Sequence, residues 1–363
     1  MIAASPRPPI SGLAPDELAR WLAARAEPAY RAGQVRAGLA RGARFEEMLE
    51  LPVSLRRALS QAFLASSLEL LAESEADRGR TTKVLYRLAG GHTVESVLMR
   101  YRDRNTLCIS SQAGCAVRCP FCATGQGPFG RNLKAHEIVD QALDAARRLA
   151  AEGGRLTHVV FMGMGEPLAN YWEVVASVRA VSDPGLLGIS PRRIVVSTSG
   201  VVPRIEKLAQ EGIPVTLAVS LHAARDELRD VLVPLNRAHP LGRLVPAARA
   251  FAERTGRRVS FEWVLLAGVN DTPRDAREMA RLLDPRSSHV NLIPFNPVPG
   301  APYRSPSAAE VRGFAGLVRE GGLNVTVRDT RGRSADAACG QLRARLGGES
   351  REGPGGGARP PRA

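Results

Sequence analysis

From residue 106 onward, short apolar runs alternate with longer segments whose apolar residues recur at helical spacing. The apolar runs predict strands at 106–110, 157–162, 193–198, 215–221, 259–265, 290–295 and 324–328. The segments between them predict helices, among them 135–151, 172–181, 246–254, 273–283 and 308–320. Alternation of this kind favours an α/β fold with a parallel sheet and right-handed crossovers. Six or more such units indicate a full or partial barrel, with functional groups at the carboxyl ends of its strands.

The first hundred residues follow a different pattern. Residues 15–73 carry apolar positions at helical spacing. Residues 82–88 and 92–101 resemble two hairpin strands, joined by a turn at Gly90-Gly91. The two ends of the chain are rich in Pro, Gly and Ala, a composition typical of disorder. We therefore expect a disordered segment 1–15, a helical accessory domain 16–78, a barrel with an N-terminal hairpin 79–346 and a disordered tail 347–363.

The composition indicates a polyanionic partner. The formal net charge is +14 and the pI about 10.6, which favours RNA or DNA through phosphate contacts. Arginine far outnumbers lysine, as a GC-rich genome would produce, but such a genome does not explain the excess of bases over acids. No apolar run reaches the ~18 residues of a membrane span, and the N-terminus lacks a signal-peptide core. We expect a cytoplasmic protein with no membrane partner and, since no coiled-coil heptads appear, a monomer.

The candidate chemistry lies in a run of three cysteines. Cys115, Cys119 and Cys122 follow one another at spacings of four and three residues, so one loop can turn their sulfurs toward one point. Four thiolates would close a zinc site or fill every iron of a cubane cluster, whereas three leave one iron open to a ligand. The spacing favours an iron–sulfur cluster over structural zinc, for which the nearest fourth ligand is His136. Incidental cysteines are the third alternative. The odd total of five cysteines argues against a secreted disulfide framework.

The sequence that flanks these cysteines resembles that of a known family. The run ends in Phe121-Cys122, with Ser110-Ser-Gln-Ala-Gly114 before it and Ala123-Thr-Gly125 after it. This resembles the RlmN/Cfr family of radical SAM methyltransferases, which methylate adenine in RNA, and the match runs from about residue 30 to 342. The resemblance implies a partial (β/α)6 TIM-like barrel, a helical N-terminal domain that helps grip RNA, and a [4Fe-4S] cluster on the three cysteines. S-adenosylmethionine (SAM) would bind its open iron.

Polar groups follow several predicted strands. Gly163-Met-Gly165-Glu166-Pro167 comes directly after an apolar strand, where glycine lets the backbone approach a ligand and a carboxylate can accept from an ammonium group. Ser197, Ser220 to His222 and Asn296 lie at or just after the ends of other predicted strands. Each of these alone is common as a cap or turn residue, but together they form the ring of polar groups that a site at the top of a barrel requires. By resemblance the SAM contacts are Gly165, Glu166, Ser197, Ser220, Leu221, His222 and Asn296. His222 could equally hydrogen-bond to a residue that contacts SAM.

Three further residues gain a role only through the resemblance. On the residues alone, Glu95 reads as a solvated strand carboxylate, and Cys108 and Cys339 read as small buried hydrophobes. The resemblance implies that a first SAM methylates Cys339 and that a second yields a 5′-deoxyadenosyl radical, which takes a hydrogen from the S-methyl group. The carbon radical adds to adenine, and Glu95 removes the ring proton as the base. Cys108 then forms a disulfide with Cys339 and releases the RNA.

The substrate also follows from the resemblance. Arg131-Asn-Leu133 resembles the RlmN branch, which implies methylation of carbon 2 of adenine in 23S rRNA at the peptidyl-transferase centre. It also implies methylation of tRNA at the adenosine 3′ of the anticodon. Such an adenine must be unstacked first. The family further implies a reducing partner such as a flavodoxin. Two alternatives stay open: Cfr-type methylation of carbon 8, and a zinc-stabilised RNA-binding protein without chemistry.

Overall fold

The fold is built on one sheet, and the computed structural model describes residues 7–328 and 341. The ten-stranded sheet has the order β1-β2-β3-β4-β7-β8-β9-β10-β11-β12. Its first four strands pair antiparallel and the pairs from β4 to β12 are parallel. The strands are β1 Glu69–Ala76, β2 Thr81–Arg87, β3 Thr93–Arg100, β4 Asn105–Cys108, β7 His158–Phe161, β8 Ile194–Thr198, β9 Thr216–Ser220, β10 Val259–Leu265, β11 Ser288–Pro294 and β12 Val325–Val327. The parallel part is therefore the partial barrel that the alternation predicts.

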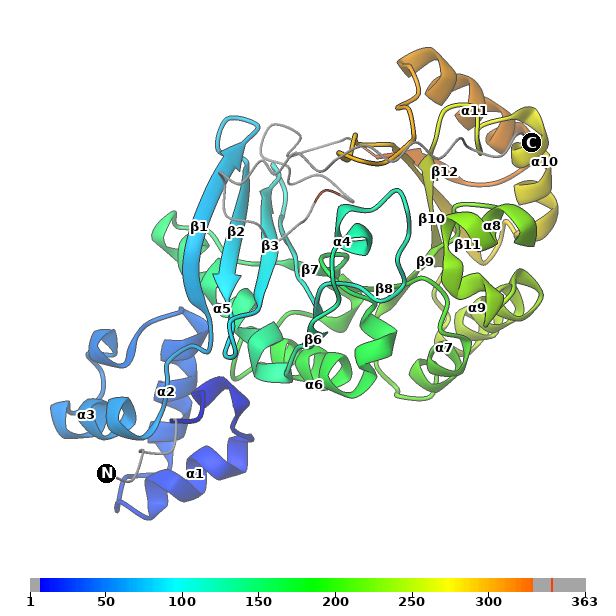
Figure 1. Cartoon of the computed structure of the whole chain (residues 1–363). Helices are drawn as coiled ribbons and strands as arrows, with labels where there is room; N and C mark the ends of the chain where they lie inside the picture. Colours follow the sequence, from blue (N-terminus) through cyan, green and yellow to red (C-terminus); the bar gives the residue numbers. More distant parts are fainter. Residues whose placement is uncertain (1–6, 329–340, 342–363) are drawn as a thin grey trace.

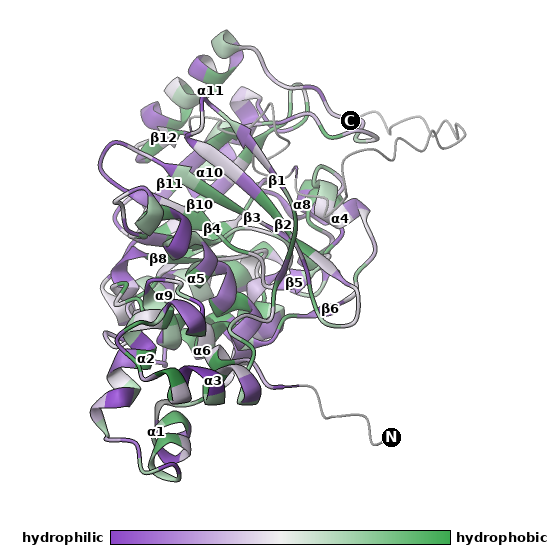
Figure 2. Ribbon diagram, turned by 90° about the vertical axis from the view of Figure 1, so that its left-hand side faces the viewer, coloured by the Kyte–Doolittle hydropathy of each residue, from purple (hydrophilic) through white to green (hydrophobic). Residues whose placement is uncertain are grey.

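Helices cover the outer, convex face of this sheet (Figure 1). They are α5 Ala135–Ala151, α6 Tyr171–Ser182, α7 Val202–Leu208, α8 Asp226–Leu232, α9 Leu241–Thr255, α10 Pro273–Leu282 and α11 Ala308–Glu320. Strand alternation divides the two faces: in β10, Trp263 packs against Phe314 of α11 with ring centroids 6.2 Å apart, whereas Glu262 points into the barrel. The alternation of polar and apolar residues is visible along the strands in Figure 2. Polar side chains thus line the interior of the barrel.

Three N-terminal helices, α1 Pro15–Ala23, α2 Tyr30–Ala40 and α3 Val53–Ala62, form a separate small core (Figure 1). Two polar contacts join this N-terminal region to the barrel. Arg36 Nη2 of α2 lies 2.6 Å from Asp183 Oδ2, and Ser67 Oγ, after α3, donates a hydrogen bond to Asp140 Oδ2 at 2.6 Å. This agrees with the expected helical accessory region.

Two expectations about the N-terminal part are wrong. The helical pattern was expected to run to residue 73, but Glu69–Ala76 is strand β1, which pairs with β2. Its Ala, Glu and Leu residues favour a helix locally, and pairing with a distant strand overrides that preference. Residues 1–15 were expected to be disordered; residues 1–6 lie outside the described part of the chain, but farther along Pro9 bridges to Leu64 and Ile10 is buried. Ile10 is apolar enough to anchor this segment to the helical core.

The remaining element predictions are mostly confirmed. The hairpin of β2 and β3 is present, and α5 and α11 have the predicted bounds. The short helices α7 and α8 were not predicted, because seven residues carry too little periodicity. The expected tail 347–363 lies outside the described residues. None of the described helices is long and apolar enough to cross a membrane.

Candidate functional site

A small closed loop carries the three cysteines. Strand β5, Gln112–Ala113, pairs with β6, Arg131–Asn132, and so brings the two ends of the loop together. Gly114 has a φ of +89°, and a Cβ there would lie 2.1 Å from the carbonyl oxygen of Pro128. Only glycine fits this position. Cys122 directly precedes the short helix α4, Ala123–Gln126, which lies within this loop.

The three thiols lie close enough to influence one another. Burial raises the pKa of Cys115 to about 12, with smaller contributions from Glu166 and Cys122. Burial likewise raises the pKa of Cys119 well above its ordinary value, and the neighbouring thiols add to the shift. These thiols must therefore lose protons when metal binds. Three soft sulfur donors on one loop suit an iron–sulfur cluster.

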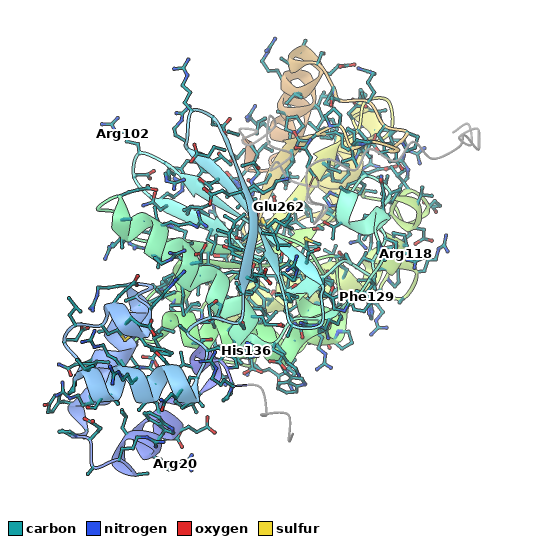
Figure 3. The ribbon with its side chains drawn as sticks, turned by 60° about the vertical axis from the view of Figure 1, so that its left-hand side comes forward. Arg20, Arg102, Arg118, Phe129, His136 and Glu262 are labelled. Carbon is teal, nitrogen blue, oxygen red and sulfur yellow. The ribbon has the colours of Figure 1, made fainter. Side chains whose placement is uncertain are left out.

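The candidate fourth zinc ligand lies away from the cysteine loop. Within residues 7–328 and 341, no three His, Cys, Asp or Glu side chains converge closely enough to hold one metal ion. A cubane cluster makes a different demand, because each thiolate binds a different iron. His136, the candidate fourth zinc ligand, packs near Gly12 and lies 3.1 Å from Ser67 Oγ. It lies beside the N-terminal helices, away from Arg118 of the cysteine loop (Figure 3).

The glycine turn after β7 is fixed to the start of the cysteine loop. The backbone N–H groups of Ser111 and Gln112 both donate to Met164 O, at 2.9 and 3.1 Å. Gln112 Oε1 accepts from the backbone N–H of Glu166 at 2.8 Å. Gly165 has a φ of +105°, and a Cβ there would lie 2.5 Å from Gln112 Cβ. The glycine therefore lets the turn and the cysteine loop pack in contact.

This turn places Glu166 inside the barrel mouth. The side chain is buried, and its two oxygens accept from the backbone N–H groups of Leu168 at 3.0 Å and Ser199 at 2.6 Å. Burial raises the pKa of Glu166, and these hydrogen bonds partly offset the shift. A bound cation beside this carboxylate would stabilise its charged form.

A cavity of about 160 Å³ opens between the cysteine loop and the carboxyl ends of β7 to β11. It is bounded on one side by Phe121 and Cys122. Five of the seven predicted SAM contacts line it: Gly165, Glu166, Ser197, Ser220 and His222. The other two do not line it: the Leu221 side chain lies in the apolar core, and Asn296 is buried just after β11.

His222 joins the cysteine loop to the barrel. Its backbone has a φ of +60°, a left-handed conformation unusual outside glycine. Its Nδ1 accepts from the backbone N–H of Val264 at 3.0 Å, and its ring contacts Phe121 edge-on with centroids 4.9 Å apart. Burial, with a smaller contribution from Arg229, lowers the pKa of His222 to about 3. The imidazole is therefore neutral at physiological pH, with its proton on Nε2.

We expect His222 to make the protein acid-labile. Its pKa is about 3 in the folded chain against an ordinary 6.5, so the unfolded chain takes up the proton first as the pH falls. The stabilisation is complete above pH 6.5 and should fall by roughly 2 kcal/mol by pH 5. In a His222→Gln variant this loss should be smaller, as measured by urea unfolding at pH 7 and pH 5. A His92→Gln variant serves as control, and equal losses in all three proteins would contradict the assignment.

Glu95 and Cys108 lie on the sheet beside this cavity. Cys108 of β4 is paired with Val97 of β3, so it shares a sheet face with Glu95 two residues along. Glu95 is 2% exposed, and its Oε1 lies 3.2 Å from Lys83 Nζ. Cys108 is buried at 8% exposure. Neither residue lines the cavity. Met162, which lies two residues beyond Val160, the register partner of Cys108, does line it. Cys339 lies outside the described residues.

Arg229 was not among the predicted site residues, because no local pattern marks it. This arginine is fully buried, and its guanidinium donates to the carbonyl oxygens of Leu221, Ser220 and Ser199 at 3.0, 2.9 and 2.7 Å. Its fourth bond goes to Asn236 Oδ1. Burial lowers its pKa to about 10, so it stays charged. Arg229 thereby joins the ends of two strands that line the cavity.

Comparison with known proteins identifies the family of this chain. Residues 109–283 match the profile described as "Radical SAM superfamily". The chain is 48% identical over 360 residues to "Probable dual-specificity RNA methyltransferase RlmN" of Frankia alni, covering 96% of this chain and 86% of that protein. It is 49% identical over 341 residues to the protein of the same name from Moorella thermoacetica, covering 92% and 96%. The chain belongs to the RlmN family of radical SAM RNA methyltransferases.

A solved structure agrees with this membership in the RlmN family. The crystal structure of a radical SAM methyltransferase from Sphaerobacter thermophilus superposes with a TM-score of 0.90 at 46% identity. The superposition covers 93% of this chain and all of that one. Membership implies a [4Fe-4S] cluster and SAM as cofactors, and the three cysteines such a cluster needs are present. The predicted family and barrel fold are thus confirmed.

Proposed function

We propose that this protein methylates carbon 2 of adenine in 23S rRNA and in tRNA, through a methylated Cys339. The observation that carries the proposal is the cavity between the cysteine loop and the strand ends, with Glu166, Ser197 and Ser220 in its wall. Relatives named as dual-specificity RNA methyltransferases, at 48 and 49% identity over nearly the whole chain, support the RNA substrates and carbon 2 over carbon 8. A reducing partner such as a flavodoxin and a monomeric state complete the proposal.

The cavity walls suit the implied cofactors. Cys115, Cys119 and Cys122 would hold the cluster, and two SAM molecules per turnover would supply a methyl group and a radical. Glu166 offers buried carboxylate oxygens to an ammonium group. Phe121, Val264 and Phe295 give the cavity apolar walls beside its polar residues.

The remaining roles fall to Glu95, Cys339 and Cys108. Glu95 takes the proton from the adenine ring, since it is a carboxylate on the same sheet face as Cys108. Lys83, 3.2 Å away, holds its Oε1 in place. Cys339 accepts the methyl group as a thiolate. Cys108 then attacks the Cys339 sulfur: the disulfide forms as the bond from that sulfur to the transferred carbon breaks, and the carbon takes up a proton and stays on the RNA as the methyl group. The unpaired electron of the adduct would return to the cluster.

One experiment tests the whole proposal. The protein is purified without oxygen, its iron is measured, and the Cys339 peptide is analysed by mass spectrometry. We expect a brown protein with about four irons and a peptide heavier by one methylene. Nucleoside analysis of treated 23S rRNA and tRNA should show 2-methyladenosine. A colourless protein with one zinc and an unmodified Cys339 would contradict the proposal, and 8-methyladenosine would replace it by the Cfr-type reaction.

Replacing Glu95, the proposed base, should stop the reaction after Cys339 has been methylated. In Glu95→Gln the amide cannot accept the ring proton, so we expect RNA methylation to fall by about 10²-fold or more. Methylation of Cys339 does not need this proton transfer and should continue. The measurement compares methylated RNA with the methylated Cys339 peptide in the same sample. A Glu75→Gln variant on strand β1 is the control, and an equal loss of both products would show that Glu95 is structural.

A further inference from the structure

Glu262 is a buried carboxylate that no role described above uses. It lies in the middle of β10, where its register partners are Ser220 on β9 and Asn291 on β11. Residues opposite each other in a sheet point to the same face, so Glu262 stands beside Ser220 inside the barrel. It lines the same cavity as Ser220 and Glu166. Figure 3 places Glu262 near the middle of the molecule, and it is 4% exposed.

The two oxygens of Glu262 have different surroundings. Oε1 accepts from Ser260 Oγ at 2.7 Å and from Asn291 Nδ2 at 2.9 Å, and these bonds fix the side chain. Oε2 is buried and meets no hydrogen-bond donor among the described residues. Arg328 Nη1 is 3.8 Å from it, too far for a hydrogen bond. A buried carboxylate oxygen left in this way costs free energy, which a ligand donor would recover.

The surroundings select the kind of donor. Arg328 also lines the cavity, so a second cation such as an ammonium group would be repelled there. Glu166, on the opposite side at the cysteine loop, is the better partner for a cationic group. A neutral hydroxyl meets no such repulsion, and Ser220 beside Glu262 offers a second polar contact for a neighbouring hydroxyl. SAM carries two adjacent hydroxyls, on its ribose.

We propose that Glu262 Oε2 accepts a hydrogen bond from a ribose hydroxyl of bound SAM, with Ser260 and Asn291 holding the carboxylate in place. The inference rests on the proposed function, because it presumes that SAM occupies this cavity. It makes Glu262 a specificity residue for the sugar, separate from the residues that would contact the iron-bound end of SAM.

The test measures binding rather than turnover. The cluster-loaded protein is kept without reductant, so that SAM is not cleaved, and equilibrium dialysis gives the affinity for SAM and for its 2′-deoxy and 3′-deoxy analogues. Wild-type protein should bind at least one deoxy analogue about tenfold or more weakly than SAM, because the carboxylate then stays unpaired. Glu262→Gln should bind SAM about tenfold more weakly and should bind that same analogue almost as well as SAM.

Two control variants separate the sugar contact from the ion pair. Arg328→Met removes the cation but leaves the carboxylate, so it should still distinguish SAM from the deoxy analogue. Ser260→Ala removes one bond to Oε1 and should keep most of the discrimination. Iron content and the visible spectrum of each variant report whether it is folded.

Several results would overturn the inference. If wild-type protein binds both deoxy analogues as tightly as SAM, that result alone refutes the inference. Glu262→Gln that weakens SAM and analogues equally would make Glu262 a purely structural residue. Loss of discrimination in Arg328→Met as large as in Glu262→Gln would assign the effect to the ion pair. If wild-type protein binds no SAM at all, the proposed function itself fails, and that outcome is distinct from the others.

Discussion

Replacing Cys119 by serine should leave the protein colourless and without activity on RNA. Its thiol is one of three on the loop, and two thiolates are too few to hold a cubane cluster with one open iron. We expect RNA methylation to fall by more than about 10³-fold, to background, because no radical chemistry is possible without the cluster. The measurement combines iron content, the visible spectrum and methyl transfer to RNA under anaerobic conditions.

Cys108→Ser is the matched control for this prediction. Cys108 is a buried cysteine on β4 rather than on the loop, and it has another proposed role. The variant should stay brown with unchanged iron, yet release little methylated RNA. If Cys108→Ser loses its iron as Cys119→Ser does, the division of the cysteines into ligands and reactants is wrong.

Replacing Arg229 by methionine should cost about 3–5 kcal/mol of unfolding free energy. The fully buried guanidinium donates to the carbonyl oxygens of Ser199, Ser220 and Leu221. Methionine has a similar length but no donor, so these carbonyls would stay buried without partners. The loss is measured from urea unfolding, with attention to the slope as well as the midpoint. SAM binding should weaken as well, because Ser220 is in the cavity wall.

Arg274→Met is the control for the arginine prediction. Arg274 pairs with Glu278 on the surface of α10, with 69% of its side chain exposed. Exposed pairs of this kind contribute about 0–1 kcal/mol, so the variant should unfold almost like the wild type. A similarly small loss in Arg229→Met would mean that the strand ends are held together by other contacts.

The candidate site could be predicted in part because its signals are local. The spacing of the three cysteines, and the Gly163-to-Glu166 turn after an apolar strand, are patterns within a few residues. The same holds for the parallel strands, whose apolar runs gave β10 its observed bounds. The residues alone favoured a solvated strand carboxylate for Glu95 and a small buried apolar residue for Cys108. Only the family resemblance indicated a function for them.

The sequence by itself therefore determined the alternation of strands and helices, the cysteine loop and the glycine turn. Tertiary structure alone decided that β1 is a strand, that His136 lies apart from the cysteines, and that Glu262 stands beside Ser220. The pairing of Lys83 with Glu95 and the burial of Arg229 belong to the same group. The physical reason is common to all of them. Periodicity and turn chemistry act between neighbours in the chain, whereas sheet register and the burial of charge depend on partners brought together only by folding.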